Sequence, residues 1–567
     1  MLKGIPASGG IAIGRALVIA EAELDIDTGR VENVQREVQR FHTAVETAKE
    51  QLRSLQKKTE KSLGNEQAML FAAHFLMLDD PEMIEAVVHK IESEGIRAEY
   101  ALQQVAHTIT EQFNAMDNAY FRERAADVKD IAKRLHQILL GEEESSFSNI
   151  TEPCILVTGD LAPSDTAQLD QKCILGIVTD IGGGTSHTAI LAQSYEIPAV
   201  MGTAYATKTI ANGDLVIIDA DKGEVLVTPS PEVLDDYFKK QAQLLEEKKD
   251  FDRYKDGPSL THDGKTVELA ANIGSPGDLQ RVMDNGAEGI GLFRTEFLYM
   301  DRQALPSEED QFLVYKQVLE TMQGKPVVIR TLDIGGDKKL DYLPIPDEMN
   351  PFLGYRAIRL SLDRKDLFQT QIRALLRAST YGNLKIMFPM IANLQELRAA
   401  KQVVADMRAE LQSEDVPTAD EVEIGMMIEV PAAAVISDLF AREVDFFSIG
   451  TNDLIQYTIA VDRMNEKISH LYEPFHPAVL RLIKTVIDNG HKGGIWVGMC
   501  GEMAADPRVI PLLIGMGLDE FSMSSPSIPK ARKVIGGVGF EKMRQIAEAV
   551  LQMGSADEIK SYLASAY

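Results

Sequence analysis

The sequence predicts a multidomain α/β protein: an N-terminal α/β domain with an all-helical insert, a helical linker, and a C-terminal (β/α)8 TIM barrel. Three observations predict this class. Helical spacing dominates the first quarter of the chain, a glycine-rich turn opens into a helix in the second quarter, and short apolar segments alternate with helical stretches in the second half. The 567 residues suffice for roughly two to four domains.

The composition narrows the class of partner. A formal net charge of −28 argues against nucleic acid and anionic membranes, because both are bound through clustered lysine and arginine. A basic protein partner suits the chain better. The N-terminus has no signal-peptide pattern, and no apolar run is long enough to span a bilayer, so we expect a cytoplasmic protein. Three cysteines without metal-ligand spacing argue against a disulfide framework.

The region from about residue 21 to residue 145 has the pattern of a helical subdomain. From Val31 to Leu55 the apolar positions step by three and four residues, which places them on one face of a long helix. Further helical patterns follow at 69–78, 83–91, 101–113 and 127–140. No convincing strand separates them, so we predict an all-helical insert.

Residues 1–20 and 146–230 are predicted to form one α/β domain around this insert. Short strand-like runs occur at 154–157, 174–179, 215–219 and 225–227. The glycine-rich beginning of the chain is expected to join the same unit.

Within this domain, residues 182–190 read GGGTSHTAI and place His187 where glycine-backed main chain opens into an apolar helix. A helix start offers unpaired N–H groups and a positive dipole end, and glycines allow close approach of an anion. The pattern therefore suits a histidine that carries a phosphoryl group. A common capped helix remains the alternative for this stretch taken alone.

A charged helical segment at 231–260 is expected to link the two halves, and residues 261–567 are predicted to form the TIM barrel. The barrel prediction depends on eight strand-like segments spread over about 300 residues. They lie at 267–272, 289–294, 327–333, 384–390, 424–429, 444–450, 495–500 and 518–523.

Polar side chains gather where these predicted strands end, and in TIM barrels that edge carries the active site. Arginines at this edge can bind a carboxylate or a phosphate group, and two carboxylates there can serve as ligands for Mg²⁺. Any single one of these residues is better explained by a surface ion pair, whereas the whole set on one face favours a site. The candidates are Arg294, Arg330, Arg356 and Arg463 for anions, Glu429 and Asp453 for the metal, and Asp333, Asn452, Cys500 and Glu502 beside them. Cys500, between glycines, suits proton transfer to an enolate, and an inert buried thiol is its alternative.

Several motifs resemble enzyme I of the bacterial sugar phosphotransferase system, the phosphoenolpyruvate-protein phosphotransferases. The resemblance covers essentially the full length, including the domain order. The motifs are TSH at 185–187, GLFRTEF at 291–297, DIGGDK at 333–338, SIGTNDL at 448–454 and GMCGE at 498–502.

By this resemblance, His187 is the phosphorylated residue, reacting through Nε2, and Cys500 protonates enolpyruvate. Arg294, Arg330, Asn452 and Arg463 hold phosphoenolpyruvate, with Asp453 and Arg356 beside them, while Glu429 and Asp453 bind Mg²⁺ or Mn²⁺. The helical insert implies a docking site for the phosphocarrier protein HPr, with His74 and residues 66–78 at that surface. The family also implies a homodimer formed through the barrel.

The chain departs from many members of this family in having Gly184, where they carry arginine, just before the TSH motif. Loss of that cation weakens phosphate capture or transfers the role of capturing phosphate to Arg124.

Two other functions stay open. A pyruvate phosphate dikinase or phosphoenolpyruvate synthase would need an ATP-binding region that this chain lacks, and a phosphoenolpyruvate-sensing regulatory paralogue would be catalytically impaired.

Overall fold

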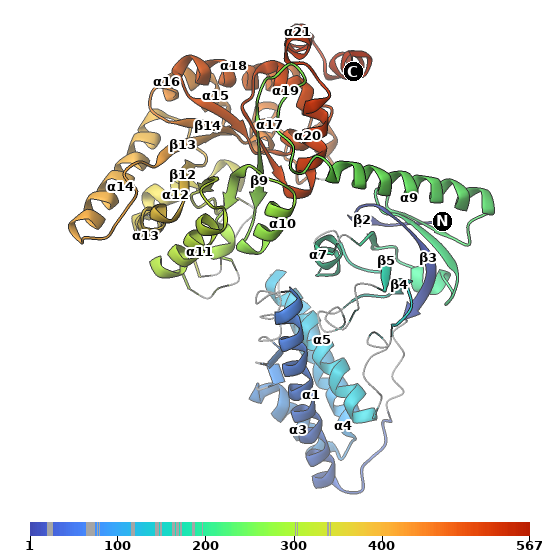
Figure 1. Ribbon diagram of the computed structural model, residues 1–567. Helices are drawn as coiled ribbons and strands as arrows, with labels where there is room; N and C mark the ends of the chain where they lie inside the picture. Colours follow the sequence, from blue (N-terminus) through green and yellow to red (C-terminus); the bar gives the residue numbers. More distant parts are fainter. Residues whose placement is uncertain are drawn as a thin grey trace. The chain divides into compact units, whose positions relative to one another are not determined.

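Figure 1 shows a computed structural model of the chain, which separates into two compact units, Met1–Glu247 and Lys248–Tyr567. It describes all residues except 20–26, 64–73, 76, 79, 115–118, 142–146, 148–149, 162–164, 166–168, 170–172, 184–186, 196, 301, 303, 337–339, 341, 347, 466 and 567. The side chains of Arg124 and His187 also lie outside the described part. Among the described helices, none has the length and apolar character needed to cross a membrane.

The first unit contains a helical part built from α1 (Val34–Leu63), α3 (Pro81–Glu94), α4 (Ala98–Asn114) and α5 (Ala119–Leu140). Side chains at helical spacing, such as Phe41 on α1, pack in a shared apolar core. Within the described residues, the predicted helical insert is therefore confirmed.

His74 corrects one expectation about this helical part. Its side chain is only 1% exposed, with Nε2 3.4 Å from Asp127 Oδ1 and Nδ1 3.9 Å from Asp130 Oδ2. Leu78 is equally buried in the helical core. The prediction that His74 lies at a docking surface is wrong, because the imidazole turns inward toward two carboxylates of α5. Residues 66–73 lie outside the described residues.

The α/β part of the first unit is one eight-stranded sheet in the order β1-β8-β7-β3-β4-β5-β6-β2. β3 runs parallel to β4 and antiparallel to β7, so the beginning of the chain joins the strands that follow the helical insert. The strands are β1 (Leu2–Lys3), β2 (Ile5–Ser8), β3 (Ile11–Ile19), β4 (Cys154–Thr158), β5 (Ile174–Thr179), β6 (Ala199–Met201), β7 (Leu215–Asp219) and β8 (Glu224–Val227).

Two short helices lie in this part, each with buried alanines packed into an apolar cluster: α7 (His187–Ser194) and α8 (Ala206–Thr209). After the sheet, α9 (Pro231–Asp252) occupies the segment predicted as a linker. Its first half is tied to the sheet, because Tyr237 donates to Asp219 at 3.0 Å and Gln241 donates to the Ile11 carbonyl at 2.9 Å.

The second unit is a closed barrel of eight parallel strands, which confirms the TIM-barrel prediction. The ring closes where β16 pairs with β9, with Glu520 opposite Glu268. The strands are β9 (Glu268–Ile273), β10 (Gly289–Arg294), β11 (Pro326–Arg330), β12 (Asn383–Phe388), β13 (Glu423–Ile428), β14 (Phe446–Ile449), β15 (Trp496–Met499) and β16 (Glu520–Ser524).

Helices cover the outside of the barrel and bury the largest apolar cluster of the chain against the strands (Figure 1). They are α10 (Leu279–Asp284), α11 (Glu308–Thr321), α12 (Ile358–Asp363), α13 (Lys365–Ala378), α14 (Leu394–Ser413), α15 (Pro431–Val435), α16 (Ser437–Phe440), α17 (Thr451–Ile459), α18 (Pro477–Gly493), α19 (Ile510–Met516), α20 (Ile528–Gly536), α21 (Phe540–Val550) and α22 (Ala556–Ala566).

Arg532 of α20 holds the segment that leads from α9 into the barrel. Its guanidinium is 3% exposed and donates to the carbonyls of Tyr254, Lys255 and Gly286 at 2.7, 2.6 and 2.8 Å. We expect Arg532→Ala to lower the free energy of unfolding of the barrel by about 2–4 kcal/mol, because buried carbonyls lose charged donors.

Chemical denaturation of the full chain, followed by the fluorescence of its single tryptophan, measures this change. Arg508→Ala is the matched control, because that side chain is 73% exposed and its ion pair with Asp506 lies at the surface. Equal effects of the two substitutions would contradict the anchoring role of Arg532.

Candidate active site

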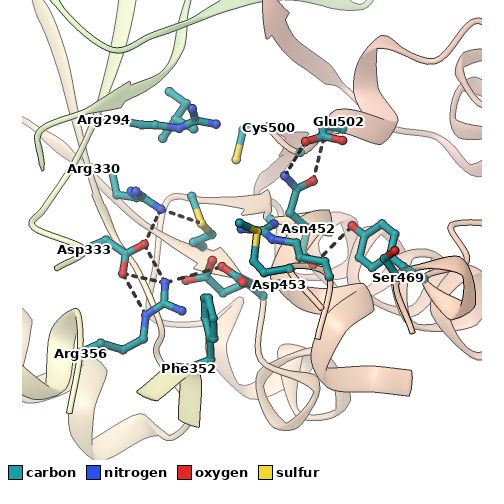
Figure 2. A pocket seen from close by; sticks show the side chains of 18 residues that line it. Arg294, Arg330, Asp333, Phe352, Arg356, Asn452, Asp453, Ser469, Cys500 and Glu502 are labelled. Carbon is teal, nitrogen blue, oxygen red and sulfur yellow. Dashed lines mark hydrogen bonds and ion pairs between the residues drawn. The ribbon is translucent and has the colours of Figure 1, made fainter. Parts of the chain in front are cut away.

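A cavity of about 600 Å³ opens at the carboxyl ends of the barrel strands. Side chains from several strands and the loops after them point into it (Figure 2). All ten barrel residues singled out from the sequence line this one cavity: Arg294, Arg330, Asp333, Arg356, Glu429, Asn452, Asp453, Arg463, Cys500 and Glu502.

Asp333 links two of the arginines at the base of the cavity. Arg330 Nη1 lies 2.8 Å from Asp333 Oδ2, and Arg356 Nη2 lies 2.9 Å from Asp333 Oδ1 (Figure 2). Arg330 Nη2 also pairs with Glu296 at 2.8 Å. Burial alone would lower the pKa of both guanidinium groups, but the carboxylates outweigh it and raise the pKa values. Both arginines are therefore fixed, permanently charged groups.

The other two arginines have donors left over for a ligand. Arg294 extends into the cavity and has no salt-bridge partner within the part of the chain that the structure describes. Desolvation and the neighbouring charge of Arg330 lower the pKa of Arg294. Arg463 Nη1 is buried and has no hydrogen-bond partner among the described residues. These donors suit the oxygens of a phosphate or a carboxylate.

Two carboxylates face the same cavity: Glu429 follows β13 directly, and Asp453 lies in the first turn of α17, after β14. Glu429, only 1% exposed, accepts a hydrogen bond from the Met390 amide at 2.6 Å. Burial, followed by the charge of Asp453, raises the pKa of Glu429 to about 8. Asp453 Oδ1 is buried and, among the described residues, has no hydrogen-bond partner. Asp453 Oδ2 lies 3.7 Å from Arg356 Nη2, so Oδ1 is the oxygen of this carboxylate that is left for a ligand.

This donor set fits a hard divalent cation. Mg²⁺ commonly takes one or two protein carboxylates and completes its octahedron with water and substrate oxygens. The described residues contain no cluster of three or more acidic, histidine or cysteine side chains suited to a metal. Glu429 and Asp453 are thus a two-carboxylate set that needs further oxygens from outside the protein.

Asn452 and Cys500 complete the cavity wall. The Asn452 amide donates to Glu502 Oε1 at 3.2 Å and accepts from the Glu502 amide at 3.1 Å, which fixes its orientation. The Cys500 thiol is 4% exposed and lies 3.9 Å from the Ile449 carbonyl. Burial raises the pKa of Cys500 to about 11, although the Ser448 hydroxyl opposes the rise. The thiol therefore holds its proton at neutral pH.

His187 belongs to the other unit, where α7 begins at this residue. The helix is held by Thr188, which is 1% exposed and donates to the Leu161 carbonyl at 3.3 Å. A residue in the first turn of a helix lies next to unpaired backbone N–H groups. Gly184 and the two residues after it lie outside the described residues.

The structure adds residues that the sequence reasoning did not assign to the site. Glu296 is 3% exposed and accepts from the Asp333 amide at 3.2 Å as well as from Arg330. Tyr457 accepts from Arg356 Nη1 at 3.2 Å. Their sequence positions could have indicated that they belong to the site, because Glu296 stands two residues after Arg294 and Tyr457 stands one helical turn after Asp453.

Comparisons with known proteins agree along the whole chain. Family models match in three parts: "PEP-utilising enzyme, N-terminal" at 3–124, "PEP-utilising enzyme, mobile domain" at 150–223, and "PEP-utilising enzyme, PEP-binding domain" at 248–539. PEP denotes phosphoenolpyruvate.

Similar proteins include three that are named phosphoenolpyruvate-protein phosphotransferase. One from Bacillus sp. (strain S) is 53% identical over 562 residues, covering 99% of this chain and 97% of that protein. One from Geobacillus stearothermophilus gives the same identity and coverage. One from Priestia megaterium is 52% identical over 566 residues, covering 100% and 99%.

Proposed function

The chain belongs to the phosphoenolpyruvate-protein phosphotransferase family, and we propose that it transfers the phosphoryl group of phosphoenolpyruvate to its own His187. The phosphoryl group then passes to a histidine of an HPr-type phosphocarrier protein, as the first step of sugar uptake. The observation that carries the proposal is the barrel cavity, which combines unpaired arginine donors, two carboxylates and a protonated thiol.

Phosphoenolpyruvate has two anionic groups, and the cavity offers matching donors. Among the described residues, Arg294 has no ion-pair partner and Arg463 Nη1 has no hydrogen-bond partner, so these two arginines bind the phosphate and the carboxylate. Arg330 and Arg356 are held by Asp333 and supply positive charge without moving. Asn452, fixed by Glu502, adds an oriented amide.

Glu429 and Asp453 would hold Mg²⁺, with Mn²⁺ as the alternative ion. When bound, such an ion neutralises charge on the phosphoryl oxygens. The raised pKa of Glu429 fits this role, because a cation would replace the proton that burial favours.

The reaction needs a nucleophile and an acid, and the chain offers one of each. His187 Nε2 attacks phosphorus in line, a P–N bond forms, and the P–O bond to the enolate breaks. The electron pair of that bond stays on the enolate. Cys500 then gives its proton to the methylene carbon, which yields pyruvate and leaves a thiolate.

His187 and the barrel cavity belong to different compact units, so the N-terminal unit must deliver the histidine and withdraw it again. α9 spans the boundary between the units and is the natural hinge element. The helical subdomain would receive the carrier, and the barrel would form a homodimer. We expect the protein to act in the cytoplasm.

Pyruvate release with and without HPr tests the proposed function. The chain is expected to release pyruvate in a single turnover without the carrier, and continuously when HPr and Mg²⁺ are present. A dikinase would require nucleotide, and a phosphoenolpyruvate sensor would release none. Either of those outcomes would contradict the proposal.

A further inference from the structure

One side of the barrel interior is polar, although barrel interiors are normally filled by branched apolar side chains. Val328, Met387, Met427 and Phe446 belong to an apolar interior cluster that also contains Leu292 and Cys500 and has Trp496 packed against it. On the polar side, the strand registers place Ser448 opposite Gly498, Gly498 opposite Glu520, and Glu520 opposite Glu268. These four residues therefore form one row across β14, β15, β16 and β9.

Glu520 is the buried carboxyl of this row, and the proposed reaction does not use it. Its side chain is 4% exposed, and Oε1 has no hydrogen-bond partner among the described residues. The carboxyl group lies between two glycines: an added Cβ at Gly498 would come within 3.2 Å of Oε2 and of the Trp496 ring, and one at Gly291 of β10 would clash with Oε1. The missing side chain at Gly498 thus lets the Glu520 carboxyl lie over β15, the strand next to that of Ser448.

The upper end of the row meets Cys500. Cys500 follows Gly498 by two residues, so its side chain points to the same interior face, about 7 Å further along the strand. Ser448 is 2% exposed, and its hydroxyl, which faces the thiol, has no hydrogen-bond partner in the described structure. A hydroxyl can accept and donate at once, so Ser448 can join the thiol to the row.

The lower end of the row reaches solvent. Glu268 is partly exposed at the beginning of β9 and stands beside Glu520. The charged groups that face these two carboxyls are Lys385, Glu288 and Glu423. Lys385 is paired with Glu423 at 3.0 Å, so neither carboxyl of the row holds this cation.

We propose that Glu520 returns a proton to Cys500 after each turnover, through Ser448, and is itself reprotonated from solvent through Glu268. This inference rests on the proposed role of Cys500 as the acid. After the thiol has given its proton to carbon, the Ser448 hydroxyl donates to the thiolate and takes the Glu520 proton. The S–H bond is restored, and the Glu520 carboxylate receives a proton from the Glu268 side.

The pKa values of Glu520 and Cys500 favour proton transfer from the carboxyl group to the thiolate. Burial raises the pKa of Glu520 to about 8, and burial raises the pKa of Cys500 to about 11. A proton therefore passes downhill from Glu520 to the thiolate. Glu520 is protonated below its folded pKa and loses its proton as pH rises through about 8. Proton return should thus fail above that pH, while the first turnover, which uses the stored thiol proton, should not.

Rapid-quench measurement of pyruvate with HPr and Mg²⁺ separates the first turnover from later ones. Glu520→Gln is expected to keep the first-turnover burst and to lower the steady rate by about 100-fold, the lower end of what positioned acid–base groups contribute. The fall of the native steady rate above about pH 8 should vanish in this variant. Glu443→Gln, whose carboxyl pairs with the exposed Arg398 at the barrel surface and outside the row, should keep both phases.

Ser448→Ala is the second variant, because within the described structure the hydroxyl it removes faces the thiol and satisfies no hydrogen-bond criterion with any other group. It should show the same burst followed by slow turnover. Native steady rates in both variants would overturn the relay. A native chain that gives no burst and no phosphohistidine would instead contradict the proposed function, so the two failures are distinguishable.

Discussion

Replacement of His187 by alanine is expected to abolish phosphoryl uptake from phosphoenolpyruvate while the barrel still binds this ligand. The variant lacks the only nucleophile that the proposed reaction uses, and loss of a covalent nucleophile costs about a millionfold in comparable enzymes. The binding groups lie in the other unit and are unchanged. Mass spectrometry measures phosphoryl uptake, and titration calorimetry measures binding.

His107→Ala is the matched control, because this histidine also lies in the first unit and is 70% exposed. It should take up the phosphoryl group as the native chain does. A His187→Ala protein that still passed phosphoryl groups to HPr would show that another residue is the carrier.

Replacement of Asp333 by alanine is expected to damage stability and activity together. Asp333 is 3% exposed and pairs with both Arg330 and Arg356, so its loss leaves buried cations with unmatched charge. Removal of one partner from such a pair costs about 3–5 kcal/mol of unfolding free energy. The misplaced arginines should also lower kcat/KM for phosphoenolpyruvate by about 100-fold or more.

Denaturation curves and steady-state kinetics measure the two effects. Glu443→Ala is the control, because Glu443 pairs at 2.6 Å with Arg398, whose side chain is 59% exposed. A surface pair contributes about 0–1 kcal/mol, so this control should remain close to native. If Asp333→Ala matched it in stability and rate, the two arginines would not depend on Asp333.

The fold could be predicted where periodicity was strong. Eight strand-like segments with intervening helices indicated the barrel, and β10 has the bounds 289–294 that the sequence predicted. β6 was not predicted from the sequence, because a strand of three residues is too short to show alternation. His74 was misplaced because a polar residue inside a helical bundle has no pattern that reveals its buried carboxylate partners.

The site could be predicted in part because parallel strands in a barrel end at one rim. That rule brought Arg294, Glu429 and Cys500 together in advance. It could not tell which arginines are held by Asp333 and which keep donors for a ligand, because such pairing depends on loop geometry. Glu520 was also not predicted as a functional residue, since it stands at the beginning of its strand, away from that rim.

Intact mass after incubation with phosphoenolpyruvate and Mg²⁺, followed by addition of HPr, tests the central claim most directly. We expect one acid-labile phosphoryl adduct per chain, mapped to His187 and lost when HPr is added. Absence of the adduct, or an adduct on another residue that HPr does not remove, would contradict the account. Gly184, where the family resemblance leads us to expect arginine, would then be the first position to change.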